Sequence, residues 1–225
     1  MNRIFTIGDV HGCASELEDL LAAIAPGADD QLIFLGDLIN KGPDSAGVLE
    51  RVRSLPNARF IIGNHELRLL RYYRTNDDSQ LKPADRETLP HLNAADFALF
   101  EQMEHYLYLP EQNVICVHGG FAPGIDWQKQ SLDTITSIQS VDPATHTWRK
   151  RTDFPGRPSW ADLCEGPEFV VYGHTPRRSV YQREHSIGID TGCANGNFLT
   201  AYEVVTGALY QVPAKRTYEE KALPA

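Results

Sequence analysis

Two stretches decide the fold: RIFTIGDVHG at residues 3–12 and QLIFLGDLINKG at residues 31–42. Each begins with an apolar run of the length of a buried strand and ends in a loop that carries an aspartate beside glycine. Apolar residues then recur at helical spacing up to Ile24, where Ser15 can cap the helix, and Asp44 can cap a second helix. Strands that alternate with helices predict an α/β arrangement with parallel pairing.

The same pattern recurs three times further along the chain. Apolar runs at residues 58–62, 113–117 and 168–172 lead into GNHE (63–66), HGG (118–120) and GHT (173–175). After residue 175 the helical spacing stops, and runs at 186–190, 197–204 and 208–212 predict a β meander. We therefore expect a mixed fold, α/β in one part and α+β in the other.

Length and composition favour one compact catalytic domain over residues 1–212. The 225 residues are 42% hydrophobic and 23% charged, which is typical of a globular chain. Residues 71–106, polar at first and then helical, could form a cap over the site. Residues 126–162 are rich in polar residues and proline and are expected to be mostly loop. Residues 213–225 are expected to form a frayed C-terminal tail.

The charge of the chain limits the partners that it can bind. With 21 basic and 30 acidic residues the formal net charge is −9, and a domain that wraps duplex nucleic acid normally shows a basic patch instead. A phosphate-bearing ligand would therefore need a local positive site, which bound divalent metals can supply. The charge is equally consistent with a role in solubility alone.

Cysteine spacing and hydropathy indicate the compartment. The four cysteines, Cys13, Cys116, Cys164 and Cys193, form no C-x-x-C pair, so neither a zinc knuckle nor a redox motif is predicted. The first residues lack the long apolar stretch of a secretory signal, and no run of 18 apolar residues predicts a membrane span. We expect a cytoplasmic protein without a membrane partner.

Each of the five apolar runs ends in a loop with aspartate, asparagine or histidine beside glycine. Ligands bind at the carboxyl ends of strands in α/β sheets, so these loops are expected to converge. The candidate metal ligands are Asp9, His11, Asp37, Asn64, His118 and His174. Oxygen and imidazole donors without thiolates suit Mn, Fe, Zn or Co, and six ligands suit two metals that share a carboxylate. Each loop is a weak signal alone, and the five together are a strong one.

At this point the sequence resembles a known family. GDVHG (8–12), GDLINKG (36–42), GNHE, HGG and GHT resemble the motifs of calcineurin-like metallophosphoesterases in the phosphoprotein phosphatase superfamily. GDLINKGPDS (36–45), WADLCEGPEFVVYGH (160–174) and IDTGCANGNFLTA (189–201) most resemble the ApaH-like phosphatases, relatives of symmetrical diadenosine tetraphosphatase.

The resemblance implies a fold and a ligand set. The fold is a four-layer sandwich, in which two mixed β-sheets are flanked by helices. Asp9 and His11 would bind one metal, and Asn64, His118 and His174 the other. Asp37 would bridge the two. The cofactor would be two divalent ions, manganese first, with iron, zinc, cobalt or nickel as alternatives.

The second motif departs from that of protein serine/threonine phosphatases, which have Asp-Arg-Gly where this chain has Asn40-Lys41-Gly42. As a neutral group, Asn40 can accept a hydrogen bond from His65 but stabilises its imidazolium less than an aspartate would. Lys41 offers a phosphoryl group a point charge, whereas arginine would bind it bidentately. These differences favour the ApaH-like branch.

The mechanism that the resemblance implies uses a hydroxide bridging two metals, which attacks phosphorus in line. His65 would protonate the leaving oxygen as general acid, and Lys41 would neutralise charge on the equatorial oxygens. Arg149 is a candidate for a second phosphate contact, although a surface role is nearly as consistent with the sequence. His91, His105, His146 and His185 have no comparable context and are predicted to be structural or surface residues.

Three functions remain open at this stage. The first is hydrolysis of nucleoside polyphosphates, such as dinucleoside tetraphosphates, nucleotide-capped RNA ends or polyphosphate. The second is a protein serine/threonine phosphatase, whose phosphoprotein substrate would be selected by residues 71–106 and 126–162. The third is a non-catalytic binding module, which all six ligand residues argue against.

Overall fold

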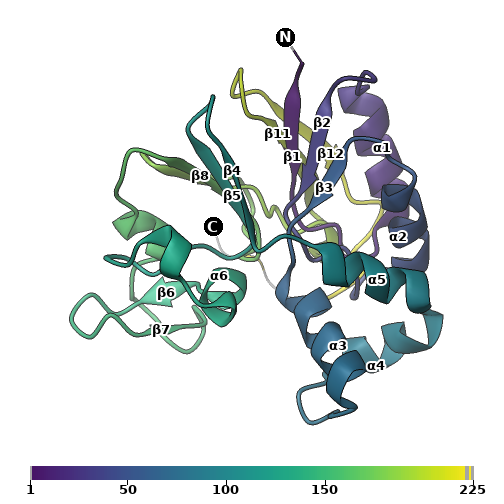
Figure 1. The fold of residues 1–225 in the computed structure, drawn as a ribbon, viewed down its shortest axis with the longest axis horizontal. Helices are drawn as coiled ribbons and strands as arrows, with labels where there is room; N and C mark the ends of the chain where they lie inside the picture. Colours follow the sequence, from purple (N-terminus) through teal and green to yellow (C-terminus); the bar gives the residue numbers. More distant parts are fainter. Residues whose placement is uncertain (1, 221–222, 224–225) are drawn as a thin grey trace.

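The computed structural model describes residues 2–220 and residue 223, and its strands form two five-stranded mixed sheets (Figure 1). The first sheet has the order β12-β11-β1-β2-β3, with bounds Leu209–Pro213, Phe198–Glu203, Ile4–Ile7, Gln31–Phe34 and Ala58–Phe60. The second has the order β4-β5-β8-β10-β9, with bounds Tyr106–Leu109, Val114–Val117, Phe169–Tyr172, Ser186–Gly188 and Tyr181–Gln182. In each sheet three parallel strands carry antiparallel strands at the edges.

Helices and short outer elements cover the two sheets. The α-helices are α1 (Ala14–Ile24), α2 (Ser45–Arg53), α3 (Asn64–Thr75), α4 (Pro83–Thr88), α5 (Ala94–Gln102) and α6 (Leu132–Ser137). The 3-10 helices are η1 (Leu89–His91), η2 (Trp127–Lys129), η3 (Trp160–Leu163) and η4 (Cys193–Asn195), and a small hairpin pairs β6 (Ser140–Val141) with β7 (Trp148–Arg149). None of the helices in the described chain is long and apolar enough to cross a membrane.

The layers follow from the alternation of side chains along each strand. In β2, Leu32 and Phe34 join the core beneath α1 and α2, whereas Ile33 points into the core between the two sheets. In β5, Cys116 lies in that central core, and Ile115 joins a third core with Trp160. Strands buried on both faces are typical of parallel sheets. The predicted four-layer sandwich is confirmed, and Figure 1 shows the two sheets face to face between their outer elements.

Two local predictions were wrong. Helix α1 begins after Cys13, which makes no side-chain cap, and Ser15 lies inside the helix. The predicted meander is divided, because β10 pairs parallel with β8 in the second sheet while β11 and β12 complete the first. Strand pairing depends on distant partners, which local alternation does not specify.

The predicted frayed tail is instead docked over its described residues. Glu16, fully buried in α1, accepts hydrogen bonds from the backbone N–H of Lys215 and the hydroxyl of Tyr218. The backbone N–H groups of Tyr218 and Glu219 donate to the carbonyl of Ala194. The tail therefore packs beside the loop that precedes β11.

Candidate metal centre

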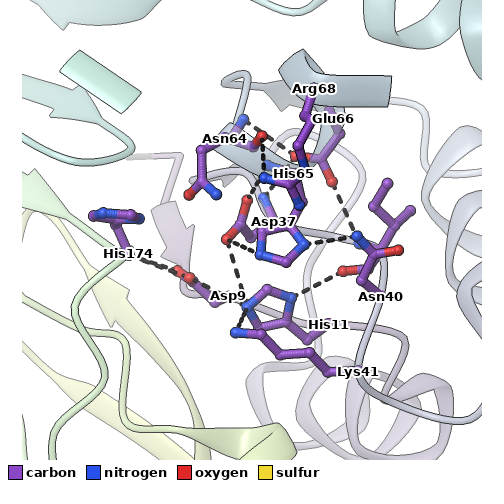
Figure 2. Close-up of polar contacts among 12 residues, drawn as sticks. Asp9, His11, Asp37, Asn40, Lys41, Asn64, His65, Glu66, Arg68 and His174 are labelled. Atoms are coloured by element: carbon purple, nitrogen blue, oxygen red, sulfur yellow. Dashed lines mark hydrogen bonds and ion pairs between the residues drawn. The ribbon is translucent and has the colours of Figure 1, made fainter. Parts of the chain in front are cut away.

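The six predicted ligand residues lie at one edge of the two sheets, in loops that follow the parallel strands. Asp9 and His11 follow β1, Asp37 follows β2, Asn64 begins α3 after β3, His118 follows β5, and His174 follows β8. The backbone N–H of His174 donates to the carboxylate of Asp9 at 3.0 Å, although the two residues are 165 positions apart. The carboxyl ends of parallel strands share one edge, and this brings the six residues together. Figure 2 labels five of them, Asp9, His11, Asp37, Asn64 and His174.

Asp37 lies at the centre of this group (Figure 2). Its Oδ2 atom is 3.5 Å from Nε2 of His11, and its Oδ1 atom is 3.5 Å from Nε2 of His118. Two sets of side chains with ligand atoms within 4.8 Å of one another share this carboxylate: His11, Asp37 and His65, and Asp37, His118 and His174. Two carboxylate oxygens that face different imidazoles suit a ligand shared by two cations.

The hydrogen bonds of the histidines favour metal binding. Nδ1 of His11 donates to the carbonyl of Ile39 at 2.9 Å, and Nδ1 of His118 donates to that of Leu35 at 2.7 Å. With Nδ1 protonated, the lone pair of Nε2 faces the centre, as it does in metal-binding histidines. Burial, with the nearby Lys41 charge, lowers the pKa of His11 to about 3, so the imidazole is neutral and able to bind a cation.

Three buried carboxyl groups face the same space. Burial and the neighbouring Asp190 and Asp37 raise the pKa of Asp9 well above its usual value. Burial also raises the pKa of Asp190 to about 6. The pKa of Asp37 is instead held well below its usual value despite its burial, because His118, His65, His11 and Lys41 face its charge. A bound cation would stabilise the charged forms of Asp9 and Asp190, which burial disfavours. The residues of this centre therefore fit two divalent metal ions.

The loops that carry these residues are conformationally strained. Non-glycine residues with a positive φ include His11 (48°), Asp37 (50°), Asn40 (70°) and Lys41 (67°), together with His174 (65°). The left-handed region costs about 1–3 kcal/mol for such residues, and strain of this kind concentrates at functional sites. A Cβ atom at Gly173 would lie 2.2 Å from Oδ1 of Asp9, so glycine leaves room for that carboxylate.

Glu66 holds the loop after β2 in place. Its side chain is fully buried and accepts hydrogen bonds from the backbone N–H groups of Asp37 and Leu38 at 2.9 and 2.8 Å. It also accepts from Ile39 and Gly63. In the sequence, Glu66 is marked only as the last residue of GNHE. The buried carboxylate explains why the loop can keep its strained conformation.

His65 belongs to a chain of polar contacts that the sequence analysis did not include. The amide nitrogen of Asn40 lies 2.7 Å from Nδ1 of His65 and 2.8 Å from Oδ1 of Asp85. Asp85 is fully buried and bound bidentately by Arg68. Because an amide oxygen would repel the Asp85 carboxylate, Asn40 must present its nitrogen. Asn40 therefore donates to His65, and the prediction that it accepts was wrong.

Lys41 connects the centre to the C-terminal tail. Its Nζ atom lies 2.7 Å from Nε2 of His11, where it contacts the ring nitrogen that faces the centre. It is also 3.8 Å from Oε2 of Glu219, and the Glu219 side chain is 39% exposed. The ammonium group of Lys41 thus lies beside the candidate ligand group, and its phosphate-binding role stays a prediction.

The structure does not bring Arg149 to the centre. Arg149 is exposed in β7, donates to the carbonyl of Trp148, and lies over the ring of Phe154. Arg151, two residues further along, is half-buried, and its backbone N–H donates to Oε1 of Gln139 at 2.9 Å. The amide nitrogen of Gln139 lies 3.2 Å from Nε2 of His174. Of these two arginines, Arg151 is therefore the one joined to His174, through Gln139.

Comparison with known proteins agrees with this geometry. Residues 2–192 match the family model described as calcineurin-like phosphoesterase. A protein of Oceanobacillus iheyensis named bis(5'-nucleosyl)-tetraphosphatase PrpE [asymmetrical] is 30% identical over 96% of this chain and 94% of its own length. A protein of the same name from Halalkalibacterium halodurans is 30% identical over 93% of each chain.

Solved structures give the same result. A structure provisionally named a diadenosine tetraphosphatase has a TM-score of 0.85 and 31% identity, and the alignment covers 95% of this chain and 94% of that one. A metallophosphoesterase from Sphaerobacter thermophilus has a TM-score of 0.59 at 20% identity over 96% of this chain and 88% of its own, which shows the fold alone. The chain belongs to the calcineurin-like phosphoesterase family. It is a metal-dependent phosphohydrolase, as the sequence motifs predicted.

Proposed function

We propose that this chain hydrolyses nucleoside polyphosphates, and that it cleaves dinucleoside tetraphosphates asymmetrically into a nucleoside monophosphate and a nucleoside triphosphate. The observation that carries the proposal is the buried carboxylate of Asp37, shared by two histidine groups, in a chain similar to proteins named asymmetrical tetraphosphatases. The sequence resemblance favours relatives of the symmetrical enzyme, and the names of the relatives favour the other cleavage position.

The ligand residues would hold two cations, with Asp37 able to serve both. Asp9 and His11 would hold one, and Asn64, His118 and His174 the other. Manganese is the first candidate and iron, zinc, cobalt or nickel are alternatives, because the donors are oxygen and imidazole. When bound, the two ions supply an activated water and polarise the phosphoryl oxygens.

His65 holds the proton for the leaving oxygen. Because Nδ1 accepts from Asn40, the ring proton lies on Nε2, which is 3.8 Å from Oδ2 of Asp37 and faces the centre. We assign His65 Nε2 as the donor to the departing oxygen. A phosphoanhydride leaving group needs this proton less than an alkoxide does. The role therefore matters most for poor leaving groups.

Two positively charged side chains neutralise the charge of the phosphoryl group in the proposed mechanism. Lys41 is the first, beside His11, and Arg151 replaces Arg149 as the second. The Nη1 atom of Arg151 is buried without a hydrogen-bond partner among the described residues. A guanidinium N–H without an acceptor beside a metal centre is suited to a phosphate oxygen, which it can bind with a charge-assisted hydrogen bond.

The other two functions receive less support. The similarity to a yeast protein serine/threonine phosphatase is 16% in identity, which shows the fold alone, and Asn40 and Lys41 depart from that branch. A non-catalytic module would lack ligands, whereas all six face one another here. Neither function is favoured.

The test is hydrolysis by the purified chain with Mn²⁺, with products resolved by ion-exchange chromatography. Diadenosine tetraphosphate, polyphosphate, capped RNA and a phosphopeptide are compared at equal concentration. We expect AMP and ATP from diadenosine tetraphosphate at the highest kcat/KM of the four. Two ADP molecules would contradict the asymmetrical cleavage. Turnover of the phosphopeptide alone would contradict the substrate class.

A further inference from the structure

Two arginines near His174, one joined to it through Gln139 and one in the loop that follows it, have no carboxylate partner within 4.0 Å among residues 2–220 and 223. Arg151 is one, and Arg177, three residues after His174 in the same loop, is the other. Arg177 is half-buried, and its Nε atom, like Nη1 of Arg151, is buried without a hydrogen-bond partner in the described part of the chain. In an acidic chain, two unpaired arginines at one place call for an anion.

The surroundings of Arg177 hold its guanidinium without neutralising it. Its backbone N–H donates to the carbonyl of Asp190, and its guanidinium lies 3.5 Å from the ring centroid of Tyr181. Arg183 lies 3.7 Å from the same centroid and must occupy the opposite face, since two guanidinium groups cannot share one. Arg183 is paired with Asp162 at 2.6 Å. Of the two arginines on this ring, Arg177 keeps its charge available.

Arg151 and Arg177 lie close together on the His174 side of the centre. Nη2 of Arg151 donates to the carbonyl of Pro176, the residue before Arg177, at 3.4 Å. Burial and then the charge of Arg177 lower the pKa of Arg151, as expected for like charges held near one another. Two like charges are kept together at a cost in free energy, which an anion between them would offset.

We propose that Arg177, next to Arg151, forms a subsite for the phosphate groups that follow the scissile one in a polyphosphate chain. This inference rests on the proposed function, since it names what selects that substrate. A substrate with one phosphoryl group fills the metal centre without reaching Arg177. A substrate with several phosphoryl groups carries further negative charge toward the loop after His174. Arg177 therefore determines specificity for chain length and does not take part in bond cleavage.

The test compares Arg177→Ala with the matched variant Arg183→Ala, which removes one arginine from the other face of Tyr181. For Arg177→Ala we expect kcat/KM for diadenosine tetraphosphate to fall about 10- to 100-fold, the range for a lost charged hydrogen bond. With p-nitrophenyl phosphate, kcat/KM of Arg177→Ala should stay within about fivefold of wild type. For Arg183→Ala, kcat/KM should stay within about fivefold of wild type with either substrate. Equal losses on the two substrates, or none on the tetraphosphate, would overturn the subsite.

A second measurement separates this inference from the proposed function. Inorganic tripolyphosphate, with Mn²⁺ in excess, should inhibit hydrolysis of p-nitrophenyl phosphate, and its inhibition constant should rise about tenfold or more in Arg177→Ala. The inhibition constant of orthophosphate should not change. If the wild-type chain leaves diadenosine tetraphosphate intact but shows this difference, the proposed function fails and the subsite stands. Should Arg177→Ala lose its cooperative melting transition, Arg177→Gln provides the same comparison.

Discussion

The segment from β1 to α3, residues 4–75, and the segment between β5 and β8, residues 118–168, both contribute to the centre in different ways. The first consists of strand, short loop and helix in regular order, and its loops supply most of the ligand residues. The second is mostly loop, and reaches the centre through His118 at its start and through Gln139 and Arg151.

The two segments have different roles at the site. In the first segment Glu66 and the flanking strands fix the backbone, so the positions of Asp37 and His11 are tightly determined. The second segment places Gln139 and Arg151 near His174 on an irregular framework. Loops carry recognition because they can vary while a rigid scaffold keeps the chemistry in place. We infer that the first segment determines the reaction and that the second contributes to substrate selection.

The largest expected effect tests the first half of this comparison. Asp37→Asn removes one charge from the ligand shared by both groups and should lower kcat with every substrate by about 10³-fold or more, since loss of one transition-state donor alone costs about 10²–10³. The bound metal, measured by elemental analysis, should fall below two ions per chain. The far-ultraviolet circular dichroism spectrum should not change. Near-normal turnover with Mn²⁺ would contradict the shared-ligand role of Asp37.

A smaller effect is expected where α4 supports the first segment. Asn40→Ala removes the donor to His65 and frees the ring to change tautomer. Loss of such a supporting hydrogen bond costs about 10- to 100-fold. The loss should be larger for phenyl phosphate than for p-nitrophenyl phosphate, because the poorer leaving group needs the Nε2 proton more. Asn57→Ala, at an exposed amide, is the control, and equal losses on both esters would exclude the proposed proton donor.

The sequence specified the first segment better than the second, for a physical reason. In residues 4–75 each candidate ligand lies within a few residues of the end of a strand. The same local pattern therefore predicts both the strand and the ligand. Asp85, Arg151 and Arg177 act through contacts with residues distant in sequence, and no local pattern marks an arginine that lacks a carboxylate partner. Nothing in the sequence distinguishes Arg149 from Arg151. Only the folded chain shows that Arg151 is joined to His174 through Gln139.

The predictions for the C-terminal tail and for the pairing of β10 were wrong for the same reason. Glu16 lies in a helix whose composition suggests exposure, and only the folded chain shows that it is buried under Lys215 and Tyr218. Likewise, alternation predicts that β10 continues a meander with β11, whereas β10 pairs with β8 and β9 in the second sheet. Predictions held where information was local and failed where it depended on packing between distant segments.

The smallest expected effect tests whether stability and chemistry are separable within the first segment. Arg3 and Asp30 precede β1 and β2, at the edge opposite the ligand loops, and are joined by a hydrogen-bonded ion pair at 2.6 Å. Asp30→Asn should lower the Tm at pH 7 by about 2–4 °C, the shift expected for about 1 kcal/mol in a chain of this size. It should leave kcat unchanged, because the strands between keep the ligand loops in place. Asp29→Asn, at the exposed neighbour, is the control.

The pH dependence of this difference has a definite sign. The hydrogen bond from Arg3 lowers the pKa of Asp30 from 3.8 to about 2. A carboxyl group whose pKa is lower in the folded state stabilises the fold above its unfolded pKa and loses that contribution as the pH falls through its folded pKa. The difference in Tm between wild type and Asp30→Asn should therefore be constant from pH 7 to about pH 5 and shrink between about pH 4 and pH 2. A difference that persists undiminished at the lowest pH would mean that the variant acts through packing, and a fall in kcat at pH 7 would show that the two edges of the sheet are coupled.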